Sequence, residues 1–335
     1  MKLDINIRLL FSVLFLILLA STFYPTNSKA QEPSGTLARA DAVACGGNGT
    51  AIITDPGENS CEFQPDIQKI TFLRVDLCTS KPTAPTTGAA LDRTNCSTFF
   101  KNDGGAEVSV QQEVGTQIGK ASDYSAVPHG SYTYGVITMH PIFKFTSSVT
   151  FSDTISDGIN ASTTCVTTVG SVDIVYGYHN GLNTAQDNVS CETGAVASEV
   201  KIGVNTMRTT GDPPNCHHLL NFNGTNGIVA GYLLEADDTL HNDVPAAGAN
   251  KDIVPNTSDG CTSGSNNEIS KVMGVMEFAS PLIIGPRTAG IQIAYNNTQG
   301  LSIDLWADSE IYKWQPSFFD FTLSTKNKRS RGAWN

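Results

Sequence analysis

The feature that most constrains the fold is a β-branched and aromatic stretch at residues 128–151, which one proline interrupts. Tyr132, Tyr134 and Val136 alternate with small or polar residues, so their side chains share one face of a strand. Pro141 breaks the run, and the apolar pattern restarts directly after it. Because a central strand does not tolerate proline, the sequence predicts a bend here, or a passage between the two sheets of a sandwich.

Other stretches show the same two-residue period. In residues 67–77 the apolar positions change parity between Phe72 and Val75, which predicts a β-bulge. Residues 291–295 and 301–305 alternate on either side of a loop rich in Asn and Gly, so we expect them to pair as a hairpin. Many short strands with turn residues between them predict an all-β fold, an antiparallel β-sandwich or jelly-roll-like architecture with long loops.

Residues 1–30 have the composition of a signal peptide. Basic residues at the start precede an apolar run at residues 9–20, which is short for a membrane span. Residues 28–30 fit small-x-small cleavage before Gln31, and an uncleaved membrane anchor is the alternative. We therefore expect a secreted, periplasmic or cell-surface protein with no transmembrane segment after cleavage.

Eight cysteines all lie beyond the predicted cleavage site. An even number in an exported chain predicts four disulfides, and eight cysteines allow 105 pairings. A sequential set would close local loops, and metal ligation is the alternative, although no C-x-x-C pair is present. The sequential set pairs Cys45 with Cys61, Cys78 with Cys96, Cys165 with Cys191, and Cys216 with Cys261.

Shifts in composition suggest how the chain is divided. An N-terminal arm and loop at residues 31–65 precede a first part of the β-sandwich region at residues 66–151. Residues 152–325 form its second part or a second β domain, and residues 326–335 form a basic tail. Seven Asn-x-Ser/Thr sequons, including the one at Asn188, would mark surface loops if they carried glycans.

The sequence contains no recognisable catalytic motif. It lacks a nucleophile elbow, a zinc-protease His-Glu-x-x-His motif and a phosphate-binding loop, so we do not expect an enzyme. The net charge of −11 disfavours nucleic acid as a partner. Asp237, Asp238 and Asp243 could hold a structural calcium ion, with a solvated acidic loop as the alternative. We expect no other cofactor.

One short motif resembles a known family. Pro128, Gly130 and Tyr132 form a P-x-G-x-Y pattern similar to the turn-to-strand element of transthyretin-like exported bacterial β-sandwich domains. In that family the turn directly precedes a strand whose tyrosine packs into the sandwich. The resemblance implies a binding or structural role rather than catalysis, and no catalytic residue carries over.

These patterns favour a secreted or cell-surface structural protein, a subunit of an extracellular filament or layer that assembles through β-strand edges. The polar arm at residues 31–44 can add a strand to a neighbour's sheet, so the expected partner is another copy of the chain; a disordered tail is the alternative. A second hypothesis is a module that binds cell-surface glycans through the long loop at residues 235–264. A third is a secreted hydrolase whose two carboxylates lie far apart in the sequence.

Overall fold

The computed structural model describes most of the chain beyond the N-terminal arm. The described residues are 36–38, 50–51, 59–110, 116–170, 174–176, 188–204, 207–208, 216–217, 219–224, 227–241, 269–297, 300–306, 310–316 and 320–327. They form β-strands, turns and one short 3-10 helix at Ala121–Asp123, which confirms the all-β prediction.

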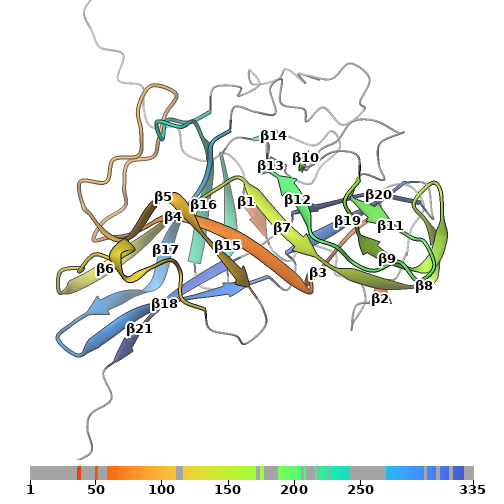
Figure 1. Cartoon of the computed structure of the whole chain (residues 1–335). Helices are drawn as coiled ribbons and strands as arrows, with labels where there is room; N and C mark the ends of the chain where they lie inside the picture. Colours follow the sequence, from red (N-terminus) through yellow and green to blue (C-terminus); the bar gives the residue numbers. More distant parts are fainter. Residues whose placement is uncertain are drawn as a thin grey trace, which may run out of the picture.

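Two large sheets account for most of the strands. The larger has ten strands, in the order β1-β15-β16-β17-β6-β4-β7-β12-β10, with β5 also paired to β4 (Figure 1). Their bounds are β1 (Thr36–Ala38), β4 (Ile67–Cys78), β5 (Cys96–Val110), β6 (Gly130–Met139), β7 (Ile142–Thr146), β10 (Ile174–Tyr176), β12 (Val200–Gly203), β15 (Leu219–Gly224), β16 (Gly227–Leu234) and β17 (Lys271–Ile284).

The smaller sheet has seven strands, in the order β11-β9-β8-β20-β19-β3, with β2 paired to β8. Its strands are β2 (Thr50–Ala51), β3 (Asn59–Phe63), β8 (Ser148–Ser156), β9 (Ala161–Thr167), β11 (Val189–Ser190), β19 (Leu301–Trp306) and β20 (Glu310–Pro316). Two further sheets have two strands each: β13 (Met207–Arg208) with β14 (Cys216–His217), and β18 (Thr288–Asn296) with β21 (Asp320–Asn327). In Figure 1 the smaller sheet lies at the right.

Strand β4 runs through the middle of the larger sheet and contains the predicted bulge. Ile70 and Phe72 are buried, and Val75 and Leu77 are buried at the opposite parity. The register of β4 shifts between Phe72 and Arg74 against both β5 and β6. The parity change in the sequence therefore predicted a real irregularity, and the prediction is confirmed.

The chain bends at Pro141 but does not leave the sheet there. Strands β6 and β7 lie on either side of this proline, and both pair antiparallel with β4. The backbone N–H of His140 donates to the carbonyl of Thr71 at 2.9 Å, which keeps the bend against β4. The passage to the smaller sheet comes later, at the buried Ser147 between β7 and β8.

The predicted hairpin is wrong, although both of its strands and its turn exist. Strand β18 pairs with β21, whereas β19 pairs with β3 and β20 in the smaller sheet. The turn is closed by a hydrogen bond from the Gly300 N–H to the Asn297 carbonyl at 2.9 Å. The buried Asn297 side chain, which directly follows β18, donates to Gln68 of β4 at 3.3 Å.

One hydrophobic cluster is shared by both large sheets. It includes Phe143 and Phe145 of the larger sheet together with Phe151, Ile303 and Trp314 of the smaller one. Cores of this kind are typical of sandwich-like packing, in which the apolar faces of two sheets meet. The boundary expected between residues 151 and 152 falls inside β8, and each large sheet takes strands from both sides of it.

Two of the four predicted disulfides are confirmed. Cys78 and Cys96 are paired residues of β4 and β5, and a bond joins their sulfur atoms. Cys165 of β9 is bonded to Cys191, which directly follows β11. Among the described side chains no cysteine is free. The other predicted disulfides lie outside what the structure describes: positions 45 and 261 are not described, nor are the side chains of Cys61 and Cys216.

Candidate functional site

Two short strands near the N-terminus, β1 and β2, each pair with one of the two large sheets. Strand β1 pairs in parallel with β15, with Leu37 opposite Phe222 in the register. Strand β2 pairs in parallel with β8, with Ala51 opposite Phe151. Because strand pairing uses main-chain groups, such additions need little sequence complementarity. We treat these two strands and their acceptors as the candidate site.

The acceptor in the smaller sheet is held firmly by the core. Val149 and Phe151 of β8 are buried in the shared hydrophobic cluster. Thr150 lies between them on the exposed face, where its hydroxyl is 3.2 Å from that of Thr164 on β9. Strand β8 is therefore also held by core packing and by its pairing with β9, neither of which involves β2.

The acceptor in the larger sheet, β15, is the second strand from the edge of that sheet. Strand β1 is the first strand in the order of this sheet, and the next strand is β15, which pairs on its other side with β16. If β1 left, the outer hydrogen-bonding groups of β15 would be exposed. An unpaired edge of this kind is a ready template for another chain.

Strand β5, the long edge strand on β4, is protected against such pairing. It contains a glycine with positive φ, Gly105, at the position where its register against β4 shifts. Lys101 and Asp103 form an exposed ion pair beside this bulge. Farther along, the carbonyl of Phe99 accepts a hydrogen bond from the Ser125 N–H at 3.0 Å. Bulges, charges and covering segments are the devices that keep edge strands from aggregating.

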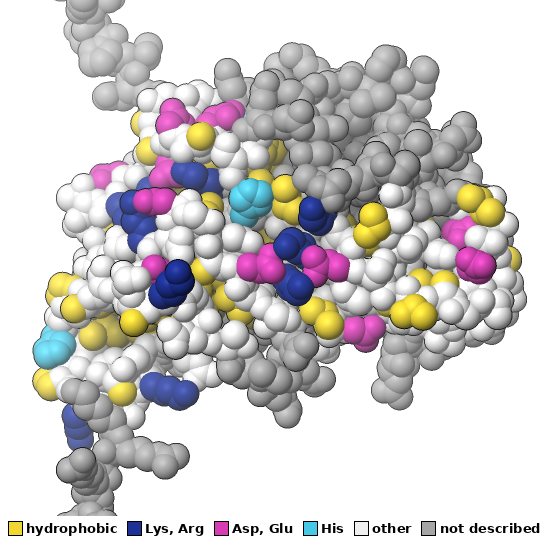
Figure 2. Space-filling view, in the orientation of Figure 1, with side chains coloured by type: hydrophobic (Ala, Val, Ile, Leu, Met, Phe, Trp, Pro, Cys, Tyr) yellow, Lys and Arg dark blue, Asp and Glu magenta, His cyan; other side chains and the backbone are white. Residues whose placement is uncertain are grey.

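The exposed face around β4, β7 and β12 contains a network of ion pairs. Lys69, Lys144 and Lys201 are register partners across these strands, an arrangement that would be destabilising for like charges alone. Glu199 pairs with both Lys69 and Lys144, and Glu107 pairs with Lys144. The hydrogen bond to Glu199 raises the pKa of Lys69. Figure 2 shows acidic and basic side chains interleaved in the middle of this face.

Two of the three calcium candidates lie in a described turn and have protein partners. Asp237 accepts hydrogen bonds from the hydroxyl and the N–H of Thr239, and these bonds lower its pKa. Asp238 is bound by the ammonium of Lys271 at 2.6 Å and by the guanidinium of Arg93 at 3.3 Å. Position 243 lies outside the described residues. Within the described part of the chain, no three His, Cys, Asp or Glu side chains are grouped as a metal site requires.

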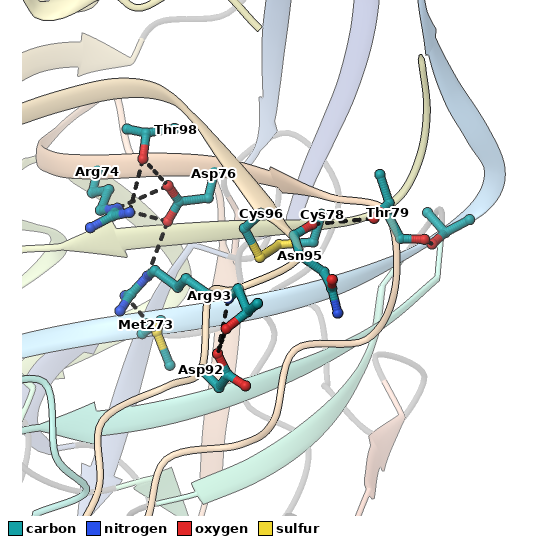
Figure 3. The surroundings of a disulfide bond; sticks show 12 residues. Arg74, Asp76, Cys78, Thr79, Asp92, Arg93, Asn95, Cys96, Thr98 and Met273 are labelled. Carbon is teal, nitrogen blue, oxygen red and sulfur yellow. Dashed lines mark hydrogen bonds and ion pairs between the residues drawn. A yellow bond between two sulfur atoms is a disulfide. The ribbon is translucent and has the colours of Figure 1, made fainter. Parts of the chain in front are cut away.

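The sequence did not indicate the buried carboxylate of Asp76 on β4, which has no exposed surface. It accepts hydrogen bonds from Arg74, from the Thr98 hydroxyl at 2.8 Å and from Arg93 at 3.1 Å (Figure 3). A buried charge must be paired and hydrogen-bonded, and this one is. These partners lie on β4, between β4 and β5, and on β5, so no short sequence motif predicts the cluster.

The buried side chain of Asp157 organises the end of the smaller sheet. One of its carboxylate oxygens accepts the N–H groups of Ile159 and Asn160 at 2.8 and 2.7 Å. The other oxygen accepts the N–H of Cys191 at 2.7 Å, beside the second disulfide. Asn188 is also buried, and its side chain binds the backbone of Trp314, so this sequon does not mark a surface loop.

The glycan-binding hypothesis placed its contacts in residues 235–264, but the described residues of that region end at His241. No described helix is long and apolar enough to cross a membrane.

Tyr132 is buried at the start of β6, and its hydroxyl donates to the carbonyl of Pro128 at 2.8 Å, which is compatible with the P-x-G-x-Y resemblance. No protein family, curated protein or solved structure matches the chain, so the resemblance stays a prediction.

Proposed function

We propose that this protein is a secreted or cell-surface structural subunit that assembles into an extracellular filament or layer by exchanging its N-terminal arm. The supporting observation is β1, a three-residue strand from the arm that forms the edge of the larger sheet and pairs in parallel with β15. The two disulfides support an oxidising compartment, because such bonds persist mainly in exported proteins.

Exchange of the arm between copies costs little free energy. The same three register pairs, with Thr36, Leu37 and Ala38 on the donor strand, can form within one chain or between two chains. The main-chain hydrogen bonds are then equal in number, so protein concentration and the geometry of the linker decide which form is populated. If each copy donates its arm to the next, the contact is heterologous, and an interface that does not close into a ring produces a filament.

The proposal is tested by removing residues 31–44 from the mature chain, which deletes β1 and keeps β2. Size-exclusion chromatography with light scattering and electron microscopy should show assemblies for the mature protein and monomers for the deletion. Unchanged assembly in the deletion variant would contradict the proposal.

A finer test alters one backbone group of the arm. Leu37→Pro removes an N–H from the middle of β1 and disfavours strand pairing, whereas Ser34→Pro changes a residue that precedes the strand. We expect the first substitution to abolish assembly and the second to leave it intact. Equal behaviour of the two variants would show that pairing of β1 does not hold the copies together.

A further inference from the structure

The segment between β4 and β5, residues 79–95, covers part of the larger sheet, and we call it the strap. The Cys78–Cys96 disulfide closes its two ends. Within it, Ala84 and Leu91 are buried in a second hydrophobic cluster. The sheet contributes several apolar side chains to this cluster, among them Val136, Tyr232, Leu234, Met273 and Val275. The strap therefore shields an apolar face that strands β6, β16 and β17 would otherwise expose.

Most of the main-chain hydrogen bonds of the strap join one part of it to another. The Asp92 N–H donates to the carbonyl of Thr83 at 3.1 Å, which closes the strap on itself. The N–H of Leu240 donates to the carbonyl of Thr86 at 2.9 Å, which ties the strap to the turn after β16. That turn also contains Asp238, so the strap and the turn are in contact as one unit.

Arg93 is the side chain of the strap that contacts both the sheet and the turn. The side chain of Arg93 is only 14% exposed, and it donates from Nε to Asp76 at 3.1 Å and from Nη1 to Asp238 at 3.3 Å. Figure 3 shows Arg93 directed toward Asp76 of β4, close to the disulfide. Lys271 of β17 binds Asp238 as well, at 2.6 Å. Arg93 is thus an ionic latch between a strand of the sheet, the strap and the turn.

We propose that the strap is a releasable cover with two locks, the Cys78–Cys96 disulfide and the Arg93 latch, and that strap and turn open together. Opening the first lock requires a thiol reductant: two reductant thiols are oxidised to a disulfide, and Cys78 and Cys96 become thiols. Opening the second lock separates the Arg93 guanidinium from the carboxylates of Asp76 and Asp238. Segments can open locally without global unfolding, and the strap contributes only Ala84 and Leu91 to the buried residues of the cluster that it covers. Its release exposes the apolar face beneath it.

Hydrogen exchange of the mature protein, measured by mass spectrometry on peptides from the strap and from residues 235–241, tests this inference. We expect Arg93→Gln to speed exchange in both peptides together, by roughly tenfold, including the Leu240 amide. The matched control is Arg74→Gln, because Arg74 also binds Asp76 but lies outside the strap. Arg74→Gln should leave the exchange rates of both peptides unchanged.

The disulfide is tested on the folded wild-type protein with a mild thiol reductant, so that no variant has to fold without it. Reduction of Arg93→Gln should expose the apolar face and increase binding of a hydrophobic dye, while reduction of wild type or Arg74→Gln should do so far less. Independent exchange of the two peptides, or equal effects of the two arginine substitutions, would overturn the inference. Equal dye binding by all three reduced proteins would also overturn it, because the latch would then not be a lock.

Discussion

Substitution Asp157→Ala probes how a buried carboxylate stabilises the smaller sheet. Asp157 is 2% exposed and accepts three backbone N–H groups, from Ile159, Asn160 and Cys191. Alanine removes all three hydrogen bonds at once and leaves the Cys165–Cys191 disulfide in place. The loss of stability therefore reports the hydrogen bonds rather than the covalent bond.

The magnitude follows from where each donor lies. Cys191 has no exposed surface, so its N–H would be left buried and unpaired, which costs about 2 kcal/mol. Ile159 is 75% exposed, so water can reach the turn, and the N–H groups of Ile159 and Asn160 would each cost only about 0.5 kcal/mol. We therefore expect the free energy of unfolding to fall by about 3 kcal/mol.

Urea unfolding with the disulfides intact, followed by tryptophan fluorescence, measures this loss. Trp314 is a suitable probe because it is fully buried in the shared core and its backbone binds Asn188, close to Cys191 in sequence. Asp103→Ala is the control, because this carboxylate is 83% exposed and its removal should change stability by less than about 0.5 kcal/mol. A loss below about 1 kcal/mol for Asp157→Ala would refute the reasoning.

Three further predictions follow from single contacts. Asn188→Ala should destabilise the fold by about 2 kcal/mol in the same urea assay, because the backbone of Trp314 loses two hydrogen bonds; a neutral result would contradict this. Gly105→Ala should cost about 1–3 kcal/mol because φ is +78° and a Cβ would lie 2.4 Å from a side chain, whereas Gly88→Ala, with open space around it, should be tolerated. Burial raises the pKa of Tyr295 well above its usual value of 10.0, so the unfolded state loses this proton first and stability falls as pH rises above that value. Tyr295→Phe should reduce this alkaline loss, and an unchanged stability–pH profile would show that Tyr295 does not cause it.

Local sequence patterns predicted the local features of the fold. The parity change after Phe72 predicted the bulge in β4, and Pro141 predicted the bend between β6 and β7. Each of these features depends on the period of a strand or on the missing N–H of proline. Two sequential cysteine pairs were also predicted correctly, because hairpin-like neighbours bring Cys78 and Cys96 into register.

Long-range pairing could not be predicted in the same way. Strands β18 and β19 have the alternation and the loop of a hairpin, yet β18 pairs with β21, and β19 pairs with β3 and β20. The cluster around Asp76 is similarly invisible in the sequence, since Arg93 reaches it only through the disulfide-closed strap. Such contacts depend on tertiary structure, which overrides local preference.

Isotope mixing with a photo-crosslinker tests the proposed assembly most directly. Mature protein labelled with nitrogen-15 and unlabelled protein, both carrying a photoreactive residue in place of Leu37, are mixed, allowed to assemble and irradiated. The register places position 37 opposite Phe222 of β15. Arm exchange predicts crosslinks between these positions in which one peptide is labelled and the other is not. Crosslinks found only between peptides of the same isotope would show that β1 stays on its own chain, and the proposed assembly would be wrong.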